Sequence, residues 1–145
     1  MRVEGRSANE DRNMQDRPTI DELLTAVQSF LEREIVPRLD GRLQFHARVA
    51  ANILAIVRRE LQLQPELTLK EWHRLAALLS KQRQEPPAAP EGVAQEVRAW
   101  TEELCAWIRS APMETLLASE ALWRHLELTT KEKLAVANPR LLSSE

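Results

Sequence analysis

Glycine is scarce in this sequence: the chain has three, Gly5, Gly41 and Gly92, and they lie far apart. Walker-type loops and dinucleotide fingerprints need clustered glycines, because only then can backbone amides approach a phosphate. Both kinds of site are therefore excluded. Tyrosine is absent and phenylalanine occurs twice, so the stacking surfaces of common RNA-binding modules are missing as well.

Cysteine and histidine are too few to suggest a metal site or a nucleophilic centre. Cys105 is the one cysteine and cannot form an internal disulfide, and the three histidines are scattered without metal-ligand spacing. No Ser-His-Asp order and no pair of carboxylates stands out. We therefore predict no catalytic residue, no metal and no cofactor, and we do not expect an enzyme.

Long apolar runs are missing, and so is an excess of charge of one sign. No run approaches the roughly 20 residues that a membrane-spanning helix needs, and residues 1–17 lack the apolar block of a secretory signal. Together with the lone cysteine, this predicts a cytoplasmic protein that does not enter a membrane. The formal net charge is -2, with Lys and Arg interleaved with acids, so nucleic acid is a poor candidate partner.

What the sequence does contain is apolar residues at helical spacing. With 145 residues, 43% hydrophobic and 29% charged, the chain has the size and composition of one globular domain. Residues 1–17 are polar and aperiodic, which predicts a disordered tail. Thr19 and Glu22 then have the spacing of a capping box, and apolar residues follow at helical intervals up to Pro37. This pattern predicts the first helix.

Four further helices are predicted downstream. Pro65 is expected to break the chain between a second helix and a third, and Thr68 with Glu71 repeats the capping-box spacing at the start of the third. A stretch at about 85–92, rich in Pro and Ala, is interpreted as a flexible linker. The second, fourth and fifth helices are placed at about 42–62, 93–110 and 119–137. The predicted fold class is all-α, a single-domain bundle of about five helices over residues 18–142, with a disordered N-terminal tail.

The second helix is apolar almost all the way round, so two or more neighbours are expected to cover it. Asn52 shares a face with its apolar residues, and a buried amide without partners costs about 1 to 3 kcal/mol. One hypothesis is a buried polar clamp that joins Asn52 to Asn138 and Arg140, just past the last helix. A contact to a ligand or a partner is the alternative. A homo-oligomer, in which another copy covers part of this apolar helix, is also compatible with the pattern.

Four basic residues gather near the start of the second helix: Arg38, Arg42, His46 and Arg48. In the ordinary interpretation, these side chains are solvated or form salt bridges. In the more specific interpretation, they contact a partner or a ligand, because a helix N-terminus also favours anions. A CoA diphosphate, an ATP phosphate or an acidic patch on another protein would each suit such a site.

The tryptophans and the other histidines are assigned simpler roles. All four tryptophans, at positions 72, 100, 107 and 123, have amphipathic spacing and are expected to fill the core. His73 and His125 are expected to be ordinary, partly exposed residues.

Two segments, "GRLQFHARVAAN" (41–52) and "KLAVANPR" (133–140), carry a resemblance to a family of small uncharacterised bacterial helical proteins. The likeness extends over most of residues 17–142. The residues that match the family pattern are Gly41, Leu43, Phe45, Asn52 and the Ala137-Asn138-Pro139 sequence that ends the last predicted helix. Members are typically encoded beside an aminoglycoside-phosphotransferase-like kinase and acyl-CoA dehydrogenases. The family includes the small partner subunit of the kinase that phosphorylates 4-hydroxyacyl-CoA in bacterial levulinate catabolism.

This resemblance implies a non-catalytic accessory subunit, with the ATP site and the catalytic Asp on the kinase. It assigns no catalytic residue to the present chain and leaves the substrate of the kinase open. The alternative hypothesis is a helical module that binds a small molecule, an acyl-CoA or a nucleotide, with Arg38, Arg42 and Arg48 near its phosphates. Calorimetric titration with CoA esters distinguishes the two.

Overall fold

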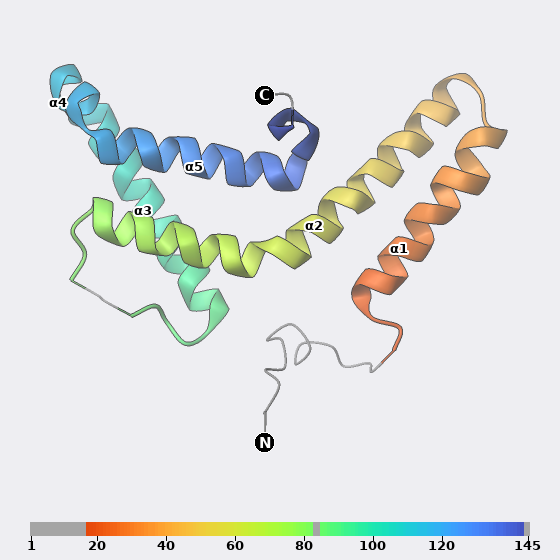
Figure 1. Ribbon diagram of the computed structural model, residues 1–145, viewed down its shortest axis with the longest axis horizontal. Helices are drawn as coiled ribbons and strands as arrows, with labels where there is room; N and C mark the ends of the chain where they lie inside the picture. Colours follow the sequence, from red (N-terminus) through yellow and green to blue (C-terminus); the bar gives the residue numbers. More distant parts are fainter. Residues whose placement is uncertain (1–16, 83–84, 144–145) are drawn as a thin grey trace. The chain divides into compact units, whose positions relative to one another are not determined.

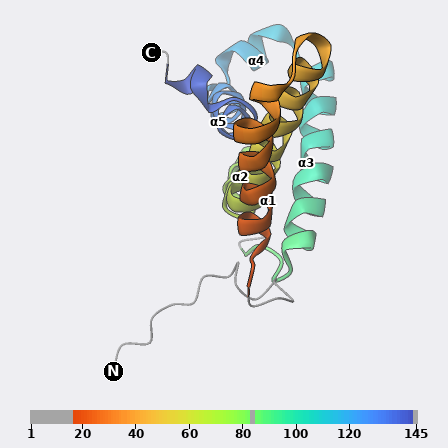
Figure 2. The same cartoon turned by 90° about the vertical axis from the view of Figure 1, so that its right-hand side faces the viewer.

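The computed structural model describes residues 17–82 and 85–143, and this part of the chain is all-α (Figures 1 and 2). It contains five α-helices and no strand, which confirms the predicted fold class. The helices are α1 (Ile20–Phe30), α2 (Gly41–Leu78), α3 (Pro90–Ser110), α4 (Met113–Ala118) and α5 (Glu120–Ala137). The predicted disordered tail falls on residues 1–17, which apart from Arg17 lie outside the described residues.

The chain divides into two compact units, with the division between Arg58 and Arg59, inside α2. The first unit contains α1 and the first part of α2. The second contains the rest of α2 together with α3, α4 and α5. The predicted domain limits of 18–142 stay a prediction.

In the first unit, α1 begins at the predicted capping box. The Thr19 hydroxyl accepts a hydrogen bond from the backbone N–H of Glu22, and the Glu22 carboxylate accepts one from the backbone N–H of Thr19. The helical path continues beyond Phe30 as a π-helical segment (Leu31–Ile35) and a 3₁₀ turn (Val36–Arg38). The predicted end near Pro37 is therefore close to the end of this path.

A sharp turn then leads into α2. Gly41 has a φ of +54°, in the left-handed region where a side chain would be strained, so glycine suits this position. After the turn, α1 lies antiparallel beside the first part of α2 (Figure 1). The side-chain amide of Gln44 donates to the carbonyl of Val36 across the turn, at 3.2 Å.

The second unit is built around the last turns of α2. Trp72 and Leu75 are almost fully buried, and Leu75 packs in a cluster with Leu104 of α3 and Leu122 of α5. α5 lies antiparallel beside this part of α2 (Figure 1). α3 runs at a steep angle to α5: Figure 2 views α5 nearly along its axis, whereas α3 is seen lengthwise.

The predicted break at Pro65 is wrong, because α2 continues through it from Gly41 to Leu78 as one helix. A proline inside a helix removes one backbone hydrogen bond and crowds the carbonyl four residues earlier. Here it is exposed and lies between strong helix formers, such as Leu63 and Glu66. The turns that follow are held by the buried Trp72 and Leu75, so tertiary packing offsets the loss.

The fourth predicted helix begins earlier than expected. Pro90 is the first residue of α3, a position that suits proline because its missing N–H would have no intrahelical partner there. Gly92 therefore lies inside the helix instead of ending the linker. A Cβ on Gly92 would lie 2.8 Å from the Cβ of Pro87, which explains why glycine fits at this close approach. The short helix α4 was not predicted as a separate element.

Candidate functional site

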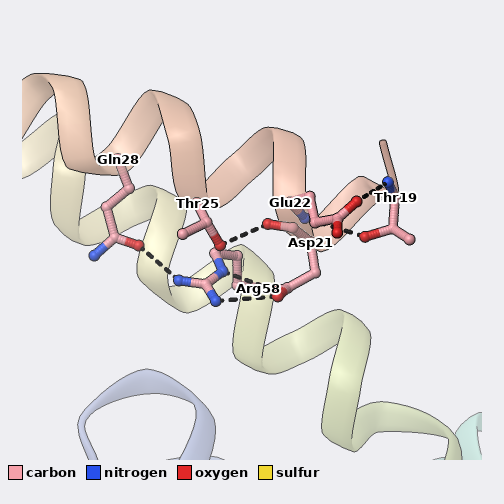
Figure 3. A network of polar contacts seen from close by, with 6 residues as sticks. All are labelled: Thr19, Asp21, Glu22, Thr25, Gln28 and Arg58. Carbon is pink, nitrogen blue, oxygen red and sulfur yellow. Dashed lines mark hydrogen bonds and ion pairs between the residues drawn. The ribbon is translucent and has the colours of Figure 1, made fainter. Parts of the chain in front are cut away.

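In the first unit, a guanidinium is held between α1 and the first part of α2 (Figure 3). Arg58 donates from Nε and Nη2 to the two carboxylate oxygens of Asp21, at 2.8 and 3.2 Å, and from Nη1 to the side-chain oxygen of Gln28, at 3.2 Å. The hydrogen bond to Asp21 raises the pKa of Arg58 above its ordinary value. This two-pronged contact joins α1 to the first part of α2.

The predicted basic contact is only partly assembled. Arg42 and His46 lie one turn apart at the start of α2, and Nε of Arg42 donates to Nε2 of His46 at 3.2 Å. Arg38 forms an exposed ion pair with Glu34 at 2.7 Å. Arg48 is exposed too, but the helical period turns it away from Arg42 and His46. The role of these residues as a partner or ligand contact stays a prediction.

The residues of the predicted clamp are all exposed. Asn52 is exposed on α2 rather than covered by apolar neighbours, so its side chain lies outside both cores. Asn138 is the C-cap of α5, and Arg140 lies in the 3₁₀ turn that follows (Pro139–Leu142). The pairing of Asn52 with these two residues stays a prediction.

A different arginine holds the end of α5. Nε of Arg59 donates to the backbone carbonyl of Val136 at 2.6 Å, and Val136 itself is buried. The last carbonyls of a helix have no partner within it, so a basic side chain stabilises them. The sequence pattern gave no signal for this contact, because the two residues are far apart along the chain.

A buried polar cluster in the second unit was also missed. Arg74 of α2 pairs with Glu132 of α5 at 2.5 Å and donates to Thr129. His125 lies nearby on α5 and is only 4% exposed, so the expectation that it is partly exposed is wrong. Nδ1 of His125 and Nε of Arg74 are buried, and neither has a hydrogen-bond partner among the described residues. Burial, and then the charge of Arg74, lower the pKa of His125.

The tryptophans divide into a core group and one exposed residue. Trp72 is 1% exposed, and its indole N–H donates to Glu96 at 2.7 Å. Trp100 and Trp107 are half-buried against the same packed groups, as expected for core residues. Trp123 is 50% exposed, so the expectation of core filling is wrong for it.

The exposed tryptophan belongs to an apolar corner where α4 meets α5. The indole N–H of Trp123 donates to the carbonyl of Leu116 at 3.1 Å, which holds the ring against the end of α4. Met113 and Leu117 lie one turn apart on α4, and both are more than 60% exposed. We call Met113, Leu117 and Trp123 the corner patch. An exposed tryptophan that is held by a hydrogen bond is typical of a protein-binding surface.

Among the described residues there is no group of three or more His, Cys, Asp or Glu side chains that could hold a metal ion. The same part of the chain includes no helix long and apolar enough to cross a membrane. Cys105 is a half-buried free thiol on α3.

Residues 37–141 match the family described as "Domain of unknown function (DUF6285)". The chain belongs to this family. No curated protein matches the chain, and no solved structure matches it.

The DUF6285 region covers all of α2, α3, α4 and α5, whereas α1 precedes it. It includes both segments that carry the resemblance described above, 41–52 and 133–140, and it includes the corner patch. The DUF6285 description assigns no activity to the family, so it adds no functional residue to those found in the structure.

Proposed function

We propose that this chain is a non-catalytic accessory subunit that binds, and activates or stabilises, an aminoglycoside-phosphotransferase-like kinase acting on hydroxyacyl-CoA. The kinase supplies the ATP site and the catalytic groups. The present chain supplies a rigid helical surface against which the kinase packs.

The observation that carries the binding role is the corner patch of α4 and α5. A large apolar side chain at full exposure is unfavourable in water, and protein interfaces are enriched in tryptophan and methionine. Trp123 is held by its bond to Leu116, so it loses little conformational freedom when a partner covers it. A pre-positioned aromatic ring of this kind is a good anchor for a pocket on another protein.

The kinase as partner is supported by the resemblance in segments 41–52 and 133–140. The second segment contains the end of α5 and the start of the 3₁₀ turn that follows, in the same unit as the corner patch. The class of kinase and its thioester substrate come from that resemblance alone.

Co-expression with a phosphotransferase-like kinase encoded beside this chain tests the proposal. We expect the two proteins to co-elute, and we expect Trp123→Ala to weaken the complex at least tenfold while the far-ultraviolet circular dichroism stays that of the wild type. Leu69→Ala, which shortens an exposed side chain of α2 outside the patch, is the matched control and should bind normally. A kinase that never co-elutes with the wild-type chain would overturn the proposal.

A further inference from the structure

The side of α2 that points away from α1 carries an apolar stripe that the proposed function does not use. Arg58 and the buried Ala51 mark the side of α2 that faces α1. At 100° per residue, Val49 and Ile53 each point about 160° away from Ala51, which is the opposite side of the helix. The apolar residues on that side are Phe45, Val49, Ile53, Ile56 and Val57. We call this set the α2 stripe.

The α2 stripe is exposed along its length. Phe45, Val49, Ile53 and Val57 are between 39% and 63% exposed, and Ile56 is half-buried. A continuous apolar row of this kind on one face of a helix is typical of a helix that packs on another helix. Since α1 covers the other side of α2, a partner for this row has to come from elsewhere.

The two ends of the stripe carry opposite charges. Arg42 lies at one end and Glu60 at the other, and both are exposed. α2 is one unbroken helix through this stretch, and a separation of 18 residues is about five full turns, so the two side chains point in the same direction as the stripe. Arg42 donates to His46, and neither Arg42 nor Glu60 forms an ion pair within the described part of the chain.

No other polar residue except His46 interrupts this face. Within about 60° of the direction of Arg42, positions 42–60 hold only the five apolar residues, Arg42, His46 and Glu60. The face is therefore apolar in its middle, basic at its N-terminal end and acidic at its C-terminal end.

This arrangement matches a reversed copy of itself. The residues of the face have the same spacing whether they are counted from Arg42 or from Glu60. When Arg42 of one copy meets Glu60 of another, the remaining pairs are Phe45 with Val57, Val49 with Ile53, and His46 with Ile56. The large apolar side chains then cover one another, and both charges find a partner of opposite sign.

We propose that a second copy of this chain covers the α2 stripe, so that the 42–60 segments of two chains pack antiparallel about a twofold axis. The contact is isologous: each copy contributes the same residues, and the axis crosses the helices at the level of Ala51. A parallel pair would place Arg42 against Arg42 and Glu60 against Glu60. The charges therefore select the antiparallel pair.

The length of the stripe suits a reversible dimer. The 42–60 segment is about 27 Å long, since each residue of a helix rises about 1.5 Å. Contacts of such short helices bury less than about 1,200 Å² in total, which is the range of weak and transient complexes. We therefore expect a dimer that dissociates on dilution.

The first test measures mass in solution with the full-length chain. Light scattering and sedimentation should give twice the 16.6 kDa of one chain at high concentration and a single chain on dilution. Ile53→Glu should shift the dissociation constant at least tenfold toward the monomer, with unchanged helix content. Val27→Glu is the matched control, because Val27 lies on α1 and is 52% exposed, as Ile53 is, and this variant should still dimerise.

Two results of this first test would overturn the proposal. One is a monomer at every concentration, whatever the kinase does; loss of kinase co-elution in Ile53→Glu would then assign the stripe to the kinase. The other is a dimer that Ile53→Glu leaves as tight as the wild type, which would place the contact elsewhere on the chain.

The second test uses the charges at the ends of the stripe. Arg42→Glu and Glu60→Arg should each weaken the dimer at least threefold at low salt, because each places like charges together. The chain that carries both substitutions restores two opposite pairs and should dimerise within about twofold of the wild type. A double variant that stays as weak as the single ones would overturn the antiparallel pairing.

The third test measures proximity. In a Cys105→Ala background, Arg42→Cys and Glu60→Cys chains are prepared separately, mixed, and treated with a short bis-maleimide cross-linker. We expect the mixture to give far more cross-linked dimer than Arg42→Cys alone, whose two thiols would lie about 27 Å apart. Equal or faster linking of Arg42→Cys alone would indicate a parallel pair and overturn the proposed arrangement.

Discussion

At the scale of single residues, His125 makes the stability of the second unit depend on pH. Its pKa is lowered from the 6.5 of a free side chain, first by burial and then by the charge of Arg74, with Lys133 acting in the same direction and Glu132 against it. Below pH 6.5 the unfolded chain therefore binds a proton that the folded chain resists. The contribution of His125 to the free energy of unfolding is therefore fully present above pH 6.5, and it is lost as the pH falls toward the lowered pKa.

We expect His125→Gln to flatten this pH dependence while lowering the stability at pH 7.5. Thermal melts of both proteins between pH 5 and 7.5 check it. A single proton contributes a slope of up to about 1.4 kcal/mol per pH unit, so the stability advantage of the wild type over the variant should narrow as the pH falls below 6.5. Parallel curves would show that His125 keeps the same affinity for protons in both states.

The tryptophans allow a paired prediction. Trp72 is buried and bonded to Glu96, so Trp72→Ala should cost about 3 to 5 kcal/mol of unfolding free energy. Trp123 is half exposed, so Trp123→Ala should cost less than about 1.5 kcal/mol. Urea unfolding of the two variants measures both values. Similar losses would mean that the corner patch is part of the core.

The sequence allowed the contacts of some residues to be predicted but not those of others. The capping box of Thr19 and Glu22 could be predicted because its bonds are local. The bonds from Arg58 to Asp21 and from Arg59 to Val136 join distant positions, which a helical period cannot pair. The exposure of Asn52 could not be predicted for a related reason: an apolar helix face indicates that something covers it but does not indicate what.

At the scale of elements, periodicity predicted most helices, and proline was the main source of error. The predicted ranges 93–110 and 119–137 lie within a few residues of α3 and α5. Pro65 was taken as a break, yet α2 continues through it. Local rules overestimated the helix-breaking effect of Pro65, because the packing of Trp72 and Leu75 further along α2 cannot be read from the sequence.

This difference leads to a prediction for Pro65→Ala. The substitution restores the missing N–H, and its hydrogen bond to the carbonyl of Leu61, in an exposed stretch of helix. The variant should be more stable by about 1 to 2 kcal/mol, because the gain in helix propensity exceeds the larger chain entropy of the unfolded state. Chemical denaturation measures it. A destabilised variant would mean that the packing of the second unit requires the local distortion that proline causes.

At the scale of the whole molecule, composition and spacing were sufficient for the all-α class and could not reveal the division into two units. That division falls inside α2, which continues through it as one helix. The second unit presents an apolar surface, the corner patch, which we assign to the kinase.

We propose that this chain serves the chemistry of another protein. The most direct measurement is the rate of ATP-dependent phosphorylation of a 4-hydroxyacyl-CoA by the neighbouring kinase, alone and with increasing amounts of this chain. We expect no turnover by this chain alone, a rate or lifetime of the kinase that rises with added chain until it saturates, and no such rise with Trp123→Ala. A kinase that is fully active and stable without the chain, or a chain that turns over the substrate by itself, would contradict it.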